Sequence, residues 1–145
     1  MESTIFLIVY LFLLAVIVGI GGTIHKLKAQ AKTTETMALE KITVLIPFRN
    51  EAQSLPRIIQ SIKNSVKLPF EIIFINDHSS DAGLAFLQEQ ISELPITIVS
   101  LPDVKSGKKE ALRYGMEHAH GDYYLTLDAD VFFGPNYFYE LEKLP

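Results

Sequence analysis

Apolar and polar residues follow two different patterns in the two parts of this chain. Residues 5–24 are almost all apolar and carry no charged side chain. Because a helix rises 1.5 Å per residue, about 20 such residues cross the roughly 30 Å hydrocarbon core of a bilayer. A cleaved signal peptide would have a basic start, a shorter apolar stretch and a small-residue cleavage site, and none of these is clear here. Residues 1–24 are therefore predicted to form a transmembrane anchor.

Lysine residues gather on one flank of this predicted anchor. Lys26, Lys28 and Lys32 follow the apolar run of residues 5–24, whereas Glu2 is the only charged side chain before that run. Lysine-rich flanks remain in the cytoplasm. We therefore expect a single-pass protein of the cell (inner) membrane with its globular part in the cytoplasm. The polar residues 25–40 are predicted to be a juxtamembrane linker.

From residue 41 to residue 145, short β-branched apolar runs alternate with stretches of helical spacing. The runs predicted to be strands are residues 42–47, 71–77, 96–101 and 122–128. The stretches predicted to be helices are residues 55–66, 84–94 and 107–119, with a further helix starting near residue 135. This alternation predicts an α/β fold, a parallel sheet with helices on both faces.

Individual positions sharpen these predictions. The first strand is expected to stop at Pro47. The buried stripe of the first helix is expected to include Val66, and that of the second to include Ile91. The residues that precede the second helix and are expected to cap it are Ser79, Ser80 and Asp81.

The composition narrows the possible chemistry. The 145 residues include 13 Lys and Arg against 17 Asp and Glu, without a basic run, so nucleic-acid binding has no electrostatic basis. The sequence has no cysteine, which excludes disulfides and thiolate metal sites. A bound metal would need carboxylate, imidazole or water ligands.

Acidic residues follow three of the predicted strands. Glu51 follows the first strand, Asp77 ends the second, and Asp128 and Asp130 end the fourth. Ligands bind at the carboxyl ends of such sheets. Four carboxylates at one edge repel one another unless a cation lies between them, and Mg²⁺ or Mn²⁺ suits oxygen ligands. Residues i and i+2 of an extended segment point the same way, so the Asp-x-Asp pair can share a metal ion.

Basic residues complete a possible site. Lys108 and Lys109, beside Gly107, offer an ammonium group for a diphosphate. Carboxylates can bind a metal ion and sugar hydroxyls, and an ammonium group can bind phosphates. Together these groups are typical of a nucleotide-sugar site. Each residue also has a purely structural interpretation: a turn former for Asp77 and a solvated helix face for the lysines. His118 and His120 lie near a helix end, where histidine is common, and are not expected to bind metal.

Four segments in order resemble the motifs of family 2 glycosyltransferases, the inverting GT-A (Rossmann-like) type. They are residues 44–51 (VLIPFRNE), 75–81 (INDHSSD), 107–115 (GKKEALRYG) and 127–131 (LDADV). The resemblance covers about residues 41–135. It implies transfer of a sugar from a nucleoside-diphosphate donor, expected to be a UDP-sugar, to a lipid or polysaccharide acceptor.

The resemblance also implies roles for single residues. Pro47 and Glu51 would border the nucleoside, and Asp77 would contact the base or ribose. Lys108 would lie near the diphosphate. Asp128 and Asp130 would bind the divalent cation, with Asp130 the more direct ligand.

The chain departs from the family pattern at several positions. Phe48 and Arg49 stand where many relatives have a small residue or tyrosine, His78 replaces a frequent glycine, and Arg113 replaces a common asparagine. In the family the general base lies well downstream of Asp-x-Asp, so it is expected beyond Pro145. The chain is thus interpreted as the anchor and donor-binding half of a glycosyltransferase, inactive alone.

Two alternatives from other classes remain. A haloacid-dehalogenase-type phosphohydrolase would use Asp128 as a nucleophile, but on the first strand of its domain. A non-catalytic, membrane-tethered nucleotide-binding domain would use the same donor-side residues. A dinucleotide oxidoreductase is disfavoured because no glycine-rich fingerprint follows the first strand.

Overall fold

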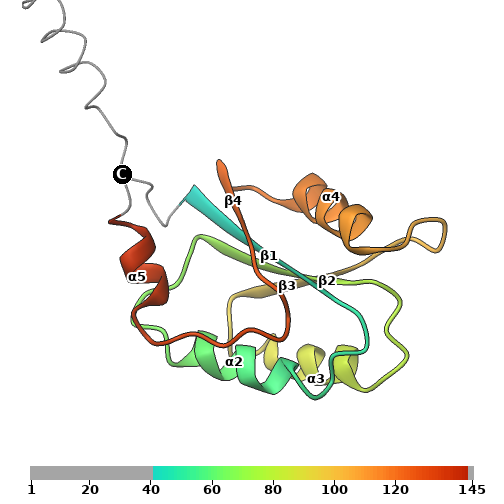
Figure 1. Cartoon of the computed structure of the whole chain (residues 1–145), viewed down its shortest axis with the longest axis horizontal. Helices are drawn as coiled ribbons and strands as arrows, with labels where there is room; N and C mark the ends of the chain where they lie inside the picture. The colour runs from blue at the N-terminus through green and yellow to red at the C-terminus, as the bar shows by residue number, and fades with distance from the viewer. Residues whose placement is uncertain (1–40, 144–145) are drawn as a thin grey trace, which may run out of the picture. The chain divides into compact units, whose positions relative to one another are not determined.

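A computed structural model describes residues 41–143, in which strands and helices alternate as predicted (Figure 1). The strands are β1 (Ile42–Phe48), β2 (Glu71–Asn76), β3 (Ile96–Ser100) and β4 (Tyr123–Thr126). The helices are α2 (Leu55–Lys63), α3 (Gly83–Gln90), α4 (Lys108–His118) and α5 (Tyr137–Leu141).

The predicted anchor and linker, residues 1–24 and 25–40, lie outside the described residues. Within residues 41–143, none of the helices has the length and apolar character needed to cross a membrane.

All four strands pair in parallel, in the order β3-β2-β1-β4. Helices α2 and α3 cover one face of the sheet and α4 covers the other (Figure 1). The strand order reverses at β1, because β2 and β3 follow on one side of it and β4 returns to the other side. Crevices for ligands open at such reversal points, outside the carboxyl ends of the strands.

The core has two layers, one on each face of the sheet. Alternate residues of β1, such as Val44 and Ile46, pack with α2 and α3, whereas Leu45 packs with Ala111 of α4. Gly115 lets α4 lie close to the sheet, because a Cβ atom there would come within 2.9 Å of the Ile75 side chain. Burial on both faces explains why these strands are continuously apolar.

The first strand does not stop at Pro47, as the sequence had suggested, but continues to Phe48. The carbonyl of Leu45 accepts the N–H of Leu127 on the β4 side (3.0 Å), and the carbonyl of Phe48 accepts the N–H of Asp77 on the β2 side (2.9 Å). By this alternation Pro47 faces the β4 side, where pairing of β1 ends at Leu45. The missing proline N–H therefore interrupts no ladder hydrogen bond.

Two residues expected in buried helical stripes lie outside the helices. Val66 follows the end of α2 and is 71% exposed, and Ile91 follows the end of α3 and is 47% exposed. Both helices end earlier than the apolar periodicity suggests. The backbone N–H of Val66 donates instead to the carbonyl of Pro135 (2.9 Å), so tertiary pairing takes the chain away from the helix.

The expected capping of α3 is also different. The N-cap residue is Ala82, which has no side chain able to cap. Asp81 accepts hydrogen bonds from the N–H of Gly83 (3.0 Å) and, across the loop, from the N–H of Ala52 (2.8 Å). Asp81 thus joins the start of α3 to the segment that leads into α2.

Candidate functional site

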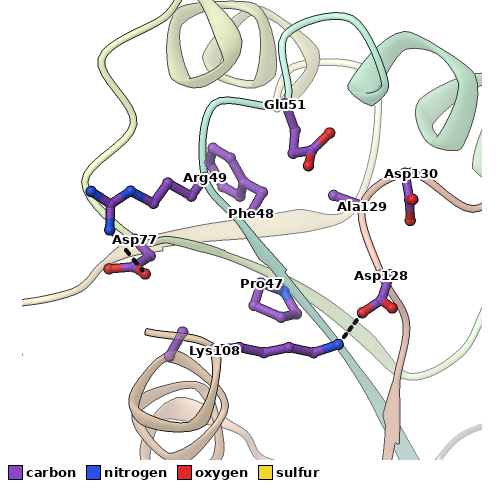
Figure 2. Close-up of a pocket in the computed structure, with 10 residues that line it drawn as sticks. Pro47, Phe48, Arg49, Glu51, Asp77, Lys108, Asp128, Ala129 and Asp130 are labelled. Carbon is purple, nitrogen blue, oxygen red and sulfur yellow. Dashed lines mark hydrogen bonds and ion pairs between the residues drawn. The ribbon is translucent and has the colours of Figure 1, made fainter. Parts of the chain in front are cut away.

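A pocket of about 330 Å³ opens at the carboxyl end of the sheet, beside β1 and β4 (Figure 2). It lies at the reversal point of the strand order. All six residues singled out from the sequence line it: Pro47, Glu51, Asp77, Lys108, Asp128 and Asp130. The remaining lining residues are Phe48, Arg49, Ala111 and Ala129.

Lys108 and Asp128 form an ion pair across this pocket (Figure 2). Lys108 is the first residue of α4, and Asp128 follows β4. Both side chains are more than half exposed, at 59% and 55%. An exposed pair of this kind contributes little to stability, so a diphosphate or a cation can replace either partner at small cost.

The Asp-x-Asp segment places two acids beside a buried small residue. Ala129 is buried, whereas Asp128 and Asp130 on either side of it are exposed and line the pocket. Within residues 41–143, acids and histidines do not form a cluster of three or more metal ligands. Proteins commonly bind Mg²⁺ through one or two carboxylates, and phosphates of the substrate supply further ligands. The Asp128 and Asp130 pair therefore fits a cation that binds together with a nucleotide.

Asp77 is the most buried acid of the pocket, with a side chain only 8% exposed. One carboxylate oxygen accepts from Nδ1 of His78 (3.0 Å) and the other from the N–H of Gly107 (2.9 Å). Burial works against ionisation, but these hydrogen bonds outweigh it and lower the pKa of Asp77. Asp77 is therefore an ionised, firmly oriented acceptor at the pocket wall.

Glu51 and Arg49 reach the pocket from the segment after β1 (Figure 2). The carbonyl of Glu51 accepts the N–H of Ser54 and of Leu55 (both 2.9 Å), which starts α2 and leaves the Glu51 side chain free to face the pocket. An Nη of Arg49 lies 3.9 Å from Asp77 and 3.3 Å from the hydroxyl of Ser106.

Arg49 was not assigned a role from the sequence. It lies in the same segment after β1 as Glu51, and this position is the sequence feature that could have indicated a place in the pocket. Nothing in the residue spacing shows that its guanidinium turns toward Asp77, since that contact joins segments 28 positions apart in the chain.

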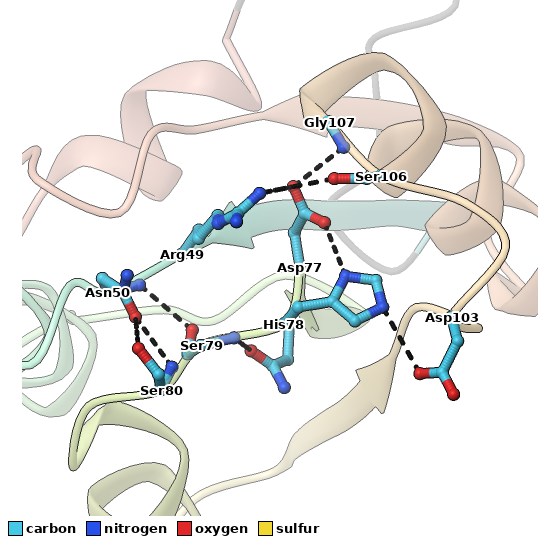
Figure 3. A network of polar contacts seen from close by, with 10 residues as sticks. Arg49, Asn50, Asp77, His78, Ser79, Ser80, Asp103, Ser106 and Gly107 are labelled. Carbon is cyan, nitrogen blue, oxygen red and sulfur yellow. Dashed lines mark hydrogen bonds and ion pairs between the residues drawn. The ribbon is translucent and has the colours of Figure 1, made fainter.

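Hydrogen bonds join the loop after β1 to the loop after β2 (Figure 3). Asn50 adopts a left-handed conformation, with φ of 55°. Its N–H donates to the hydroxyl of Ser79 (3.1 Å), and its side-chain oxygen accepts the N–H of Ser80 (2.8 Å). These two serines, expected as helix caps, instead fix the loops that carry the pocket residues.

The remaining candidates lie away from the pocket. His118 contacts the carbonyl of Tyr114 through Nδ1 (2.8 Å), and His120 contacts Glu71 at the amino end of β2 (3.0 Å). Arg113 pairs with Glu117 on α4 (3.6 Å). The two histidines are thus held by contacts at the end of α4 and in the loop that follows it.

Comparisons with known proteins agree with this geometry. Residues 43–144 match the family described as Glycosyl transferase family 2. The chain belongs to glycosyl transferase family 2. An undecaprenyl-phosphate 4-deoxy-4-formamido-L-arabinose transferase from Enterobacter sp. (strain 638) is 34% identical over 102 residues, which cover 68% of this chain and 31% of that protein. This family 2 chain thus spans about a third of the length of the curated relatives it matches.

Solved structures share the fold of the described residues. The structure of residues 1–349 of TarS from S. aureus aligns with a TM-score of 0.63 at 19% identity, over 69% of this family 2 chain and 30% of that chain. Glucosyl-3-phosphoglycerate synthase from Mycobacterium tuberculosis, solved with Mn²⁺, UDP and phosphoglyceric acid, aligns with a TM-score of 0.56 at 26% identity, over 67% and 36% of the two chains.

Family membership removes the phosphohydrolase alternative. In that class the nucleophilic aspartate follows the first strand of the domain. Here Asp128 follows β4, the fourth strand in the described part of the chain, and β4 occupies an end of the four-stranded sheet.

Proposed function

We propose that this chain supplies the nucleotide-sugar-binding part of an inverting family 2 glycosyltransferase that acts at the cytoplasmic face of the cell membrane. The observation that carries the proposal is the gathering of six residues, from four separate segments, around one pocket at the reversal point of the sheet. The acceptor is proposed to be a lipid or a polysaccharide. The relative from Enterobacter supports a lipid, because its name states undecaprenyl phosphate.

The donor is proposed to be a UDP-sugar. Pro47 and Glu51 would border the nucleoside on the β1 side of the pocket, and Asp77 would accept a hydrogen bond from the base or ribose. Lys108 would contact the diphosphate from the start of α4. Its exposed ion pair with Asp128 supports this role, since the ammonium group can move to a phosphate without being desolvated first.

A divalent cation, Mg²⁺ or Mn²⁺, is proposed to bind with the donor. Asp130 and Asp128 would hold it together with the diphosphate oxygens, and Mn²⁺ in the synthase from M. tuberculosis supports this choice. When bound, the cation would neutralise the charge of the departing nucleoside diphosphate. The two carboxylates keep that charge-neutralising site beside Lys108, where the leaving group is expected.

The general base and the membrane anchor complete the proposal. A base must lie within hydrogen-bond reach of the attacking hydroxyl, and we propose that it is supplied downstream of Pro145. The apolar residues 1–24 are proposed to anchor the protein and to keep the pocket near a lipid acceptor.

Isothermal titration of the full chain in detergent with UDP tests the proposal. UDP is expected to bind in the presence of MnCl₂, and EDTA or the double change Asp128→Ala and Asp130→Ala is expected to abolish the binding. Asp122→Ala is the matched control, because Asp122 is an exposed acid at the other end of β4 that pairs with Lys41. Binding that is indifferent to EDTA and to the double change would refute the proposal.

A further inference from the structure

His78 holds a backbone conformation that favours glycine. Its φ is 56°, in the left-handed region, which only a few per cent of non-glycine residues adopt. A non-glycine residue keeps this strained backbone conformation only where the surrounding contacts stabilise it. The contacts of the imidazole therefore indicate what the residue does here.

The imidazole lies between two carboxylates (Figure 3). Its Nδ1 is 3.0 Å from one oxygen of Asp77, and because a carboxylate only accepts, His78 donates this hydrogen bond. Its Nε2 lies 3.7 Å from a carboxylate oxygen of Asp103, in the loop between β3 and α4. Among the described residues, His78 stands behind Asp77 and is not part of the pocket lining.

Asp77 connects His78 to the start of helix α4. Its second carboxylate oxygen accepts the N–H of Gly107 (2.9 Å), the residue directly before α4. Gly107 has φ of 97°, a conformation that strains any residue with a side chain. Because glycine has no side chain to make contacts, the backbone hydrogen bond to Asp77 is what holds Gly107 in place. Lys108, which follows it, lines the pocket.

We propose that His78 is a positioning residue for the donor pocket: it orients Asp77, which in turn fixes Gly107 and thereby the place of Lys108. The two ends of this contact series lie in different loops, after β2 and before α4, so His78 ties these loops together. The inference rests on the proposed function only where it assigns Lys108 to the donor.

Two substitutions separate the hydrogen bond from the backbone conformation. His78→Gly keeps a residue suited to positive φ but removes the donor to Asp77. His78→Asn also suits positive φ, and its amide nitrogen is bonded to Cγ as Nδ1 is in histidine, so a donor remains. Neither substitution adds backbone strain, so a difference in unfolding temperature between the two variants reports the side-chain hydrogen bond to Asp77.

The first readout is amide hydrogen exchange at Gly107, measured by NMR on the full chain in detergent. In His78→Gly this exchange is expected to be about ten times faster than in the wild type, because the acceptor is no longer held, and in His78→Asn it is expected to stay within about threefold. Equal exchange in all three proteins would overturn the inference, as would equally fast exchange in both variants.

The second readout is UDP affinity in MnCl₂. His78→Gly is expected to bind UDP about tenfold more weakly than the wild type, as is usual when the partner that orients a ligand-binding group is removed, and His78→Asn within about threefold. Unchanged affinity in His78→Gly would overturn the positioning role. If the wild type itself does not bind UDP, the proposed function fails, whereas the Gly107 measurement still decides whether His78 fixes the loop.

Discussion

Gly121 occupies a position where the backbone leaves no room for a side chain. A Cβ atom there would come within 2.5 Å of the carbonyl oxygen of Lys41 and 2.7 Å of the hydroxyl of Thr43. The N–H of Gly121 also donates to that hydroxyl (3.1 Å). The turn into β4 therefore requires glycine, and through β4 it sets where the Asp-x-Asp segment lies.

Gly121→Ala is expected to lower the free energy of unfolding by about 2 to 4 kcal/mol, since backbone rather than a flexible side chain must move. Urea unfolding followed by circular dichroism measures this. Gly134→Ala is the matched control, because a Cβ atom there would have no described atom within 4 Å, and it is expected to change little. Equal effects of the two substitutions would contradict this account.

The two adjacent lysines of α4 also differ at the residue scale. Lys108 lines the pocket, whereas Lys109 does not; Lys109 borders an open surface hollow with Leu112 and Met116, to which Lys108 also contributes. Lys108→Ala is expected to weaken UDP binding about tenfold or more, because it removes a charged hydrogen-bond donor and leaves Asp128 uncompensated. Lys109→Ala is expected to change the affinity less than about twofold, within the usual effect of an exposed charge. Titration calorimetry distinguishes them, and similar losses would remove Lys108 from the site.

At the scale of elements, helix α4 is held at both ends. Its start is fixed by the hydrogen bond from Gly107 to Asp77, described above. Beyond its end, Glu71 accepts hydrogen bonds from the N–H of His120 (3.0 Å) and from the hydroxyl of Thr43 (2.8 Å). Glu71 opens β2, so this second cluster ties the loop after α4 to the amino end of the sheet, opposite the pocket.

The ionisation of Glu71 makes this contact depend on pH. Burial opposes its ionisation, but hydrogen bonds from His120 and Thr43 prevail and lower the pKa of Glu71 below 4.5. A lowered folded-state pKa contributes stability that is present above the unfolded-state value and is lost as the pH falls through the folded-state value.

Glu71→Gln is therefore expected to lower the free energy of unfolding by about 1 to 3 kcal/mol at pH 7, the cost of a lost charged hydrogen bond. The difference from the wild type should shrink as the pH falls from 5 toward 3. Urea titrations across this pH range measure it. Glu93→Gln provides the comparison, since Glu93 is exposed and its ion pair within residues 41–143 is with Lys63 at the surface. If Glu71→Gln lowered the free energy of unfolding by the same amount at every pH, the charge of Glu71 would not be the source of the stabilisation.

At the scale of the whole described domain, the pocket exists because the sheet reverses its order at β1. Glu51, Asp77 and Asp128 follow β1, β2 and β4, which are neighbours in the sheet although β4 is far from β1 in sequence. A ligand in the pocket therefore contacts groups from both ends of the described chain. Its binding is expected to stabilise the whole fold rather than one loop.

UDP with MnCl₂ at about 100 times its dissociation constant is expected to add about 2.7 kcal/mol to the free energy of unfolding. For a domain of this size that corresponds to a rise in unfolding temperature of about 10 °C or more. Thermal unfolding followed by circular dichroism measures the shift. Uridine at the same concentration is the control and is expected to give a much smaller shift, since it lacks the diphosphate for Lys108. Equal shifts would show that Lys108 and the acid pair do not contribute.

The amino-acid sequence by itself determined the alternation of strands and helices and the residues that meet at the pocket. Apolar runs and helical stripes are local patterns, and in a parallel sheet the residues that follow each strand reach one edge. The strand-end rule predicts Glu51, Asp77 and the Asp-x-Asp pair at this edge, and the position beside Gly107 indicates Lys108. It placed the ends of elements less well, as Pro47 and Val66 show, because tertiary hydrogen bonds decide where a strand or helix stops.

Only the tertiary structure decided which partners each of these residues has. The sheet order sets β4 beside β1. In the folded chain Arg49 turns toward Asp77, His78 lies between two carboxylates, and the N–H of Gly107 donates to Asp77. The contacts of Asp77 with Arg49 and with Gly107 join segments 28 and 30 positions apart, and neither periodicity nor spacing carries information about them. Their physical origin is the packing of α4 against a sheet whose strands pair out of sequence order.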